Sequence, residues 1–178
     1  MGTGQSLLTI GALMMISIII LNFYRISNGI SSTLDFSRFH MEGLSILTSH
    51  IEQLSQYFFD EVSTNIEAEK SLDMFTSPAN LGVDPNDQGI IDDIDDLNQV
   101  TLADTGISGV IYHIHYDVDY VMIQGDSIVH SNVRQYHKRV TISVCDAFNP
   151  PMIYTEQGSS RVRDTLRIST IISYWFYN

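Results

Sequence analysis

The pattern of hydrophobic and polar positions divides the chain into three parts, and the first is an apolar run from Leu7 to Tyr24. Within the run, one threonine, one serine and one asparagine interrupt the apolar side chains, and the first charged side chain belongs to Arg25. A helix of this length rises roughly 27 Å, about the thickness of the hydrocarbon core of a bilayer. We therefore expect residues 1–27 to form an apolar helix that can span a membrane.

The flanks of this run differ from those of a cleaved secretory signal. Such a signal has basic residues before its apolar region and a small-residue cleavage site after it. No basic residue precedes Leu7, and Leu-Asn-Phe-Tyr-Arg follows at residues 21–25. The pattern M-G-x-x-x-[ST] is matched by Gly2 and Ser6, but an acyl chain adds little anchoring to a spanning helix. We interpret the run as a retained helix and the acylation pattern as a coincidence.

The second part, residues 28–67, has the period of an amphipathic helix. Apolar residues recur at spacings of three and four, which places them on one face of a helix. These positions are Met41, Leu44, Leu47, Ile51, Leu54, Phe58 and Val62. Since no proline occurs before Pro78, we expect a single helix from about residue 5 to the mid-60s. The poor helix formers at Ser27-Asn28-Gly29 predict a bend or a melted turn there.

The third part begins with an acidic, turn-rich loop at residues 78–98 and continues as strands over residues 108–178. Polar and apolar residues alternate cleanly from Val110 to Ile123, which is typical of a half-buried strand. The same alternation returns at residues 140–144 and again from Thr165 to Tyr177. Short connections between alternating strands favour an antiparallel sheet. We predict an α+β fold in which the amphipathic helix covers the apolar face of this sheet, so that residues 28–178 form one globular domain.

Composition narrows the functions to consider. The 178 residues include 21 acidic and 9 basic side chains, giving a net charge of −12. A nucleic-acid partner requires a basic surface, so we expect none. Cys145 is the one cysteine, which excludes an intrachain disulfide.

The layout of the whole chain resembles a type IV pilin or pseudopilin. An apolar helix continues as an amphipathic helix and is followed by a small antiparallel sheet. The block Ile91-Asp-Asp-Ile-Asp-Asp-Leu-Asn98, the tyrosine-rich strand after it and Lys-Arg-Val-Thr-Ile-Ser-Val at 138–144 are similar to minor pilins. In that family the subunits wait in the inner membrane and are then extracted by assembly machinery into a filament on the bacterial surface.

The resemblance implies a function and a set of assembly residues. The chain would be a structural subunit that polymerises with itself into an extracellular filament and would not be an enzyme. Adhesion, motility, secretion and uptake are all open as the purpose of such a filament. The residues of the apolar helix that would form the filament core are Gln5, Leu7, Leu8, Ile10, Gly11, Leu13, Met14, Ile16 and Ile20. Pilins usually carry a glutamate where this chain has Gln5, and a proline where it has Asn22. An amide at residue 5 can accept a hydrogen bond but cannot neutralise a neighbour's amine.

A second function shares most of these features. A single-span protein could remain in the membrane as a monomer and display its acidic domain to a ligand. The lack of charge on the N-terminal side of the apolar run favours the filament. A helix that leaves lipid to pack against copies of itself moves between two apolar environments, so it needs no charged residues at that end.

The loop from Asp84 to Asp95 is a candidate calcium site. Its oxygen-bearing residues and its glycine have spacings close to those of an EF-hand loop. The candidate ligands are Asp84, Asn86, Gln88, Asp92 and Asp95. The alternative is a turn-rich acidic loop whose aspartates accept hydrogen bonds from backbone N–H groups. No other cofactor is expected.

Two further groups of residues have a chemical and a structural interpretation. One face of a predicted strand carries His113, His115, Asp117 and Asp119. The two imidazoles could bind a transition metal, but we favour the interpretation that this is the exposed polar face of an antiparallel strand. The aromatic segment Tyr174-Trp175-Phe176-Tyr177 would be either a contact surface or part of the core. The sequence contains neither a nucleophile elbow nor a phosphate-binding glycine loop.

Overall fold

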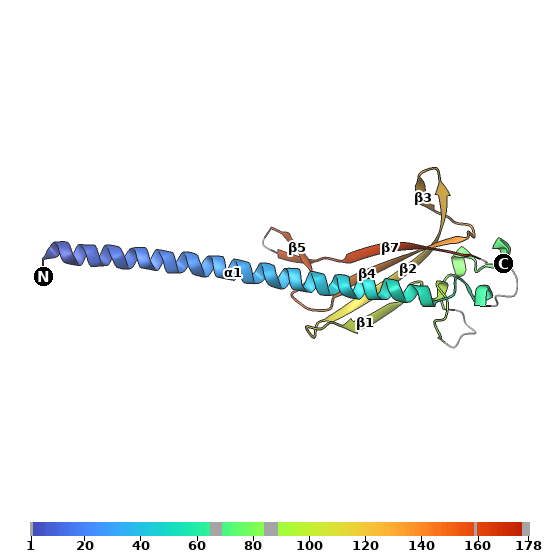
Figure 1. Ribbon diagram of the computed structural model, residues 1–178, viewed down its shortest axis with the longest axis horizontal. Coiled ribbons are helices and arrows are strands. Elements are labelled where there is room, and N and C mark those ends of the chain that lie inside the picture. Colours follow the sequence, from blue (N-terminus) through green and yellow to red (C-terminus); the bar gives the residue numbers. More distant parts are fainter. Residues whose placement is uncertain (1, 65–68, 84–88, 159, 176–178) are drawn as a thin grey trace. The chain divides into compact units, whose positions relative to one another are not determined.

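The computed structural model describes residues 2–64, 69–83, 89–158 and 160–175 (Figure 1). It has the predicted α+β class, with a long N-terminal helix and a C-terminal antiparallel sheet. The chain divides into two compact units, residues 1–40 and residues 41–178.

The helix α1 runs from Thr3 to Gln53 without interruption, so the predicted melted turn near residue 28 is wrong. Poor helix formers are accommodated there because their hydroxyls bond back to the preceding turn. Ser31 Oγ donates to the Ser27 carbonyl at 3.1 Å, and Thr33 Oγ1 donates to the Gly29 carbonyl at 3.0 Å. The first unit therefore consists of continuous helix from Thr3 onward.

The end of α1 comes about ten residues earlier than expected. A short 3-10 helix η1, Leu54–Gln56, follows Gln53, and Tyr57 then takes an extended conformation. Phe58 forms a parallel bridge with Asp93, in which the Ile94 N–H donates to the Phe58 carbonyl at 2.9 Å. This long-range pairing overrides the helical period that continues through Phe58 in the sequence.

The buried face of the helix in the second unit also differs from the predicted stripe. Leu47 and Leu54 are buried as expected, but Met41 and Leu44 are exposed. Gly43, Ile46 and His50 are buried instead, and a Cβ on Gly43 would lie 2.8 Å from Leu166 Cδ1 and 3.1 Å from Ile153 Cδ1. Close approach at a glycine thus rotates the contact face away from the purely apolar stripe.

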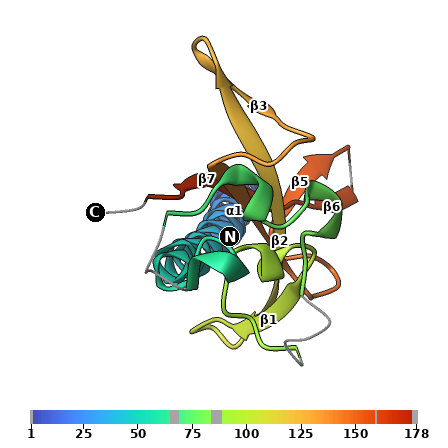
Figure 2. The same ribbon diagram turned by 90° about the vertical axis from the view of Figure 1, so that its right-hand side faces the viewer.

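The main sheet has the order β1-β2-β4-β7 and is antiparallel throughout (Figure 1). Its strands are β1 Thr101–Thr105, β2 Ile111–Gln124, β4 His137–Asp146 and β7 Leu166–Ser173. The strand β3, Ser127–His130, pairs with the end of β2 in a hairpin that extends past the other strands (Figure 2). A separate hairpin joins β5, Tyr154–Gln157, to β6, Ser160–Arg163.

The predicted alternation of β2 and β4 is confirmed. Every second residue from Tyr112 to Tyr120 is buried, and Val140, Ile142 and Val144 are buried opposite them. The strand β7 forms an edge of the sheet, and its Ile168 remains partly exposed. The sheet also begins earlier than residue 108, because β1 pairs with β2 although all its side chains are exposed and give no alternating signal.

After η1, the segment that leads to β1 contains further short 3-10 helices in its described parts. These are η2 Glu61–Thr64, η3 Leu72–Met74, η4 Pro78–Asn80 and η5 Asp95–Leu97. It contributes Phe59 and Phe75 to a cluster around Tyr120 of β2. Irregular chain is thereby fixed on one end of the sheet by burial of aromatic rings.

Candidate functional site

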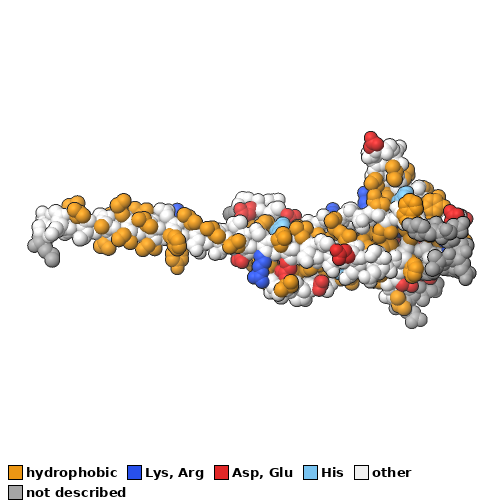
Figure 3. All heavy atoms as spheres, in the orientation of Figure 1, with side chains coloured by type: hydrophobic (Ala, Val, Ile, Leu, Met, Phe, Trp, Pro, Cys, Tyr) orange, Lys and Arg blue, Asp and Glu red, His pale blue; other side chains and the backbone are white. Residues whose placement is uncertain are grey.

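The residues of the predicted assembly helix lie in the first unit and are all exposed. Leu7 and Leu8 are each about three-quarters exposed, and a Cβ placed on Gly11 would meet no atom within 4 Å beyond the adjacent residues and the backbone of its own helix. Exposed hydrophobic side chains cover the N-terminal half of α1 (Figure 3). The others of the set are Gln5, Ile10, Leu13, Met14, Ile16 and Ile20. Among the described residues, α1 is the one helix that is long and apolar enough to cross a membrane, a property that membrane anchors share with signal sequences.

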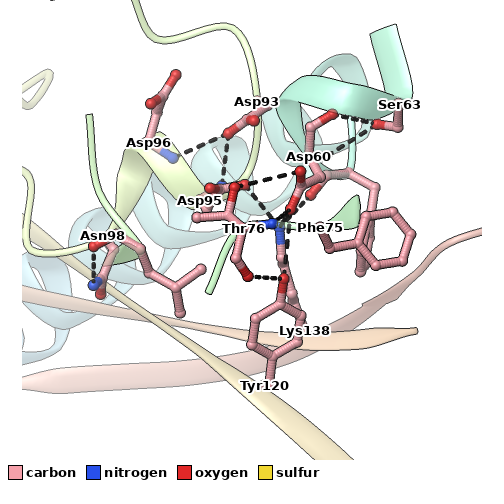
Figure 4. Close-up of polar contacts among 12 residues, drawn as sticks. Asp60, Ser63, Phe75, Thr76, Asp93, Asp95, Asp96, Asn98, Tyr120 and Lys138 are labelled. Carbon is pink, nitrogen blue, oxygen red and sulfur yellow. Dashed lines mark hydrogen bonds and ion pairs between the residues drawn. The ribbon is translucent and has the colours of Figure 1, made fainter. Parts of the chain in front are cut away.

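The second unit holds an ionic centre that the sequence analysis did not identify, which we call the Lys138 site. Lys138 is fully buried, and its Nζ donates to Asp95 Oδ1 at 2.7 Å, to Asp60 Oδ2 at 2.9 Å and to the Phe59 carbonyl at 2.6 Å (Figure 4). The two carboxylates are almost completely buried as well. The ammonium also lies 4.5 Å from the centre of the Phe59 ring and 5.3 Å from that of Tyr120.

Three separate elements bring these groups together. Lys138 lies on β4 directly opposite Tyr120 of β2, on the buried face of the sheet. Asp60 comes from the irregular chain after α1, and Asp95 begins η5. The sequence contains one indication of this site. Lys138 precedes Val140 and Ile142 by two and four residues on the same strand, so its side chain points to the same face, which is the buried one. A buried lysine requires carboxylate partners.

Hydrogen bonds hold Asp60 in a fixed position. Its Oδ2 accepts from the Thr76 N–H at 2.9 Å and from Tyr120 Oη at 3.4 Å, and its Oδ1 accepts from Thr76 Oγ1 at 3.4 Å. Tyr120 Oη also lies 2.9 Å from the Thr76 carbonyl. Burial, with Asp60 nearby, raises the pKa of the Tyr120 phenol, so this hydroxyl remains a donor.

Asp93 lies beside this centre and is also buried. Burial, reinforced by the neighbouring charge of Asp95, raises the pKa of Asp93 to about 8, so its carboxyl group is mainly protonated at neutral pH. Its Oδ1 accepts the N–H groups of Asp95 at 2.9 Å and Asp96 at 3.1 Å. In turn, Asp96 Oδ2 accepts the Asp92 N–H at 3.2 Å. Aspartates of the Ile91–Asn98 block thus bind backbone N–H groups.

The candidate calcium ligands are only partly described. Asp84, Asn86 and Gln88 lie outside the described residues. Asp92 is exposed, and Asp95 is bonded to Lys138. Within the described chain, no group of three or more His, Cys, Asp or Glu side chains could hold a metal ion. Calcium binding here stays a prediction.

The polar face of β2 forms cross-strand pairs. His115 Nδ1 lies 3.0 Å from Thr101 Oγ1 of β1, and Asp117 accepts from Gln99. Asp119 accepts two hydrogen bonds from Arg139 of β4, at 2.9 and 2.7 Å, and its Oδ2 lies 2.8 Å from His130 Nδ1. The hydrogen bond to Asp119 raises the pKa of His130. His113 is exposed.

The C-terminal aromatic segment divides between its two interpretations. Tyr174 is half-buried and meets the Phe75 ring edge to face, with centroids 5.2 Å apart, so it belongs to the core. Trp175 is 70% exposed, as a contact residue would be. Phe176 and Tyr177 lie outside the described residues.

Two polar side chains, those of Glu42 and His50, join the last turns of α1 to the sheet and to the loop before β2. Glu42 accepts from the Ser108 N–H at 2.7 Å and from Tyr112 Oη at 3.0 Å. His50 Nδ1 lies 2.6 Å from Tyr116 Oη. Glu42 can reach these groups because it adjoins Gly43, where the helix lies closest to the sheet.

Comparisons with known proteins provide no relative for this arrangement. No protein family, no curated protein and no solved structure matches the chain.

Proposed function

We propose that the chain is a structural subunit of an extracellular helical filament, similar to a type IV pilin, which polymerises with copies of itself through the apolar half of α1. The observation that carries the proposal is the surface of this half-helix. From Leu7 to Tyr24 it exposes large apolar side chains and carries no charge. An apolar surface of this extent requires cover from lipid or from other apolar helices.

Lipid covers the apolar half of α1 first, and other copies of the helix cover it after assembly. Before assembly the helix is held in the inner membrane, and after extraction by the assembly machinery it packs against the same helix of neighbouring subunits. Gly11, Ala12 and Ser17 allow close approach of helices in such a bundle. The acidic second unit forms the outer surface of the filament at the cell surface, where its charge maintains solubility.

Truncation of two core residues tests this proposal. Leu13 and Ile16 are three positions apart and lie about 60° from each other around the helix, on one face that neighbouring copies in a bundle would bury. A double change, Leu13→Ala with Ile16→Ala, opens cavities costing about 2–5 kcal/mol at each residue in every subunit. We expect membrane insertion to persist while filaments disappear from sheared surface material or disassemble at lower temperature. Insertion is measured by membrane fractionation, and filaments by negative-stain microscopy with mass spectrometry.

A volume-conserving variant serves as the matched control. Leu13→Met with Ile16→Leu retains apolar volume at both positions and should retain filaments. Normal filaments in the alanine variant would contradict core packing. If the native chain forms no filament under any condition but remains in the membrane, the single-span monomer with a displayed acidic domain takes the place of this proposal.

A further inference from the structure

The Lys138 site brings an amine and a carboxyl group into contact in a position that excludes water. Lys138 Nζ lies 2.9 Å from Asp60 Oδ2, and both side chains are at most 1% exposed. A second carboxylate, Asp95, lies 2.7 Å from the same nitrogen. A condensation needs one carboxyl group as acyl donor and another group to move protons, and the site contains both.

We propose that Lys138 and Asp60 condense into an intramolecular amide that joins β4 to the chain after α1. The new bond links Lys138 Nζ to Asp60 Cγ, and the bond from Cγ to Oδ1 of Asp60 breaks. The ammonium and the carboxylate together supply all atoms and charges, so the products are a neutral secondary amide and one water molecule. No oxidant, metal or other reactant is required.

Asp95 is placed to relay the protons. It accepts one proton from the Lys138 ammonium, which frees the nitrogen lone pair to attack Asp60 Cγ. Two protons that leave the nitrogen pass by this route to the departing Oδ1 and complete the water molecule. The Asp95 N–H is fixed by Asp93 Oδ1 at 2.9 Å, which holds the relay residue at the start of η5.

The donors around Asp60 stabilise the transition state. Charge develops on Oδ2 as the tetrahedral centre forms, and this atom accepts from the Thr76 N–H at 2.9 Å and from Tyr120 Oη at 3.4 Å. Preorganised donors of this kind in a dry site lower the barrier to acyl transfer. Thr76 Oγ1 lies 3.4 Å from Oδ1, the leaving oxygen.

Proximity and burial favour the amide over the ion pair. In water an amine and a carboxylate do not condense appreciably, but effective concentrations of well-oriented groups reach about 10⁵–10⁸ M. The rings of Phe59 and Tyr120 lie against the nitrogen and help to exclude the water that would hydrolyse the product. The bond would stabilise a chain whose single cysteine cannot form an internal disulfide.

Peptide mapping of the full-length chain tests the proposal. The protein is purified in detergent, denatured and digested with trypsin. An amide at Lys138 blocks cleavage there and joins residues 135–139 to the peptide that contains Asp60, residues 39–70. The expected product has the summed mass of these two peptides less one water molecule, and fragmentation places the link at Lys138 and Asp60.

The digest also separates the alternatives. Asp95 falls in a different tryptic peptide, residues 71–134, so a link to that peptide would overturn the assignment of Asp60 as acyl donor. Cleavage after Lys138 with both peptides at their full sequence masses would overturn the amide altogether. Both readings come from the native chain, so they do not depend on the folding of a variant.

Two variants provide further readouts. Asp60→Ala should abolish the link, while Asp95→Asn should reduce its yield at least about tenfold through loss of the proton relay. Undiminished linkage in Asp95→Asn would remove Asp95 from the mechanism. Filament formation is a separate measurement, and its absence would leave this test unaffected.

Discussion

Tyr116 Oη lies 2.6 Å from His50 Nδ1, and this contact joins the buried face of the sheet to the last turns of α1. The two rings also meet edge to face, with centroids 5.9 Å apart. Both residues are buried, so neither polar atom can exchange its partner for water at little cost. The packing of α1 on the sheet therefore depends on a polar contact as well as on apolar area.

Removal of the Tyr116 hydroxyl should destabilise the second unit. Tyr116→Phe leaves the buried His50 nitrogen without its partner, and we expect the free energy of unfolding to fall by about 1–3 kcal/mol. Thermal unfolding of the full-length chain in detergent, followed by near-ultraviolet circular dichroism, measures this loss. Tyr136→Phe is the matched control, since the Tyr136 ring packs on Phe75 and is partly exposed. Equal stability of native chain and Tyr116→Phe would show that the contact contributes nothing.

His50 should make the fold sensitive to mild acid. Burial lowers the pKa of His50, and the opposing charge of Asp104 compensates only in part. The unfolded chain then binds a proton more readily than the folded chain, so stability is present above the ordinary pKa near 6.5 and is lost as pH falls through the lower folded value. As pH falls from 7.5 to 5, the melting temperature of the native chain should therefore decrease relative to that of His50→Gln. An unchanged slope in that variant would assign the effect to another group.

Asp93 should give the stability of the fold the opposite dependence on pH. Its pKa is raised to about 8 by burial and by Asp95, so its contribution to stability is present below the ordinary value near 4 and is lost as pH rises towards 8. Asp93→Asn retains an oxygen for the N–H groups of Asp95 and Asp96 but carries no ionisable proton. We expect this variant to melt at least about 3 °C higher at pH 8 and to match the native chain near pH 4. A lower melting temperature at pH 8 would contradict the raised pKa.

Calcium binding by the loop from Asp84 to Asp95 is tested by chelation. If the site exists, EDTA should lower the melting temperature of the full-length chain, and millimolar calcium should restore it by mass action. Asp92→Asn removes an exposed candidate ligand and should abolish the response. The same melting curve with EDTA and with calcium would favour the acidic loop whose aspartates bind backbone N–H groups.

Local patterns in the sequence were sufficient to predict several elements of the fold. The apolar length from Leu7 to Tyr24 specified a helix of span length, because helix rise per residue is fixed. The alternation in β2 and β4 specified which side chains are buried, because successive residues of a strand point to opposite faces. Together these patterns were sufficient for the α+β class.

The tertiary structure decided what depends on residues distant in sequence. The pairing of Phe58 with Asp93 ended the helix earlier than its own period indicates, and the close approach at Gly43 selected its buried face. The Lys138 site draws on residues 60, 95 and 138, whose separations in sequence carry no period. The alternation along β4 puts Lys138 on the buried face, but only the fold supplies its carboxylates, since a buried ammonium is stable only where long-range packing brings opposite charges to it.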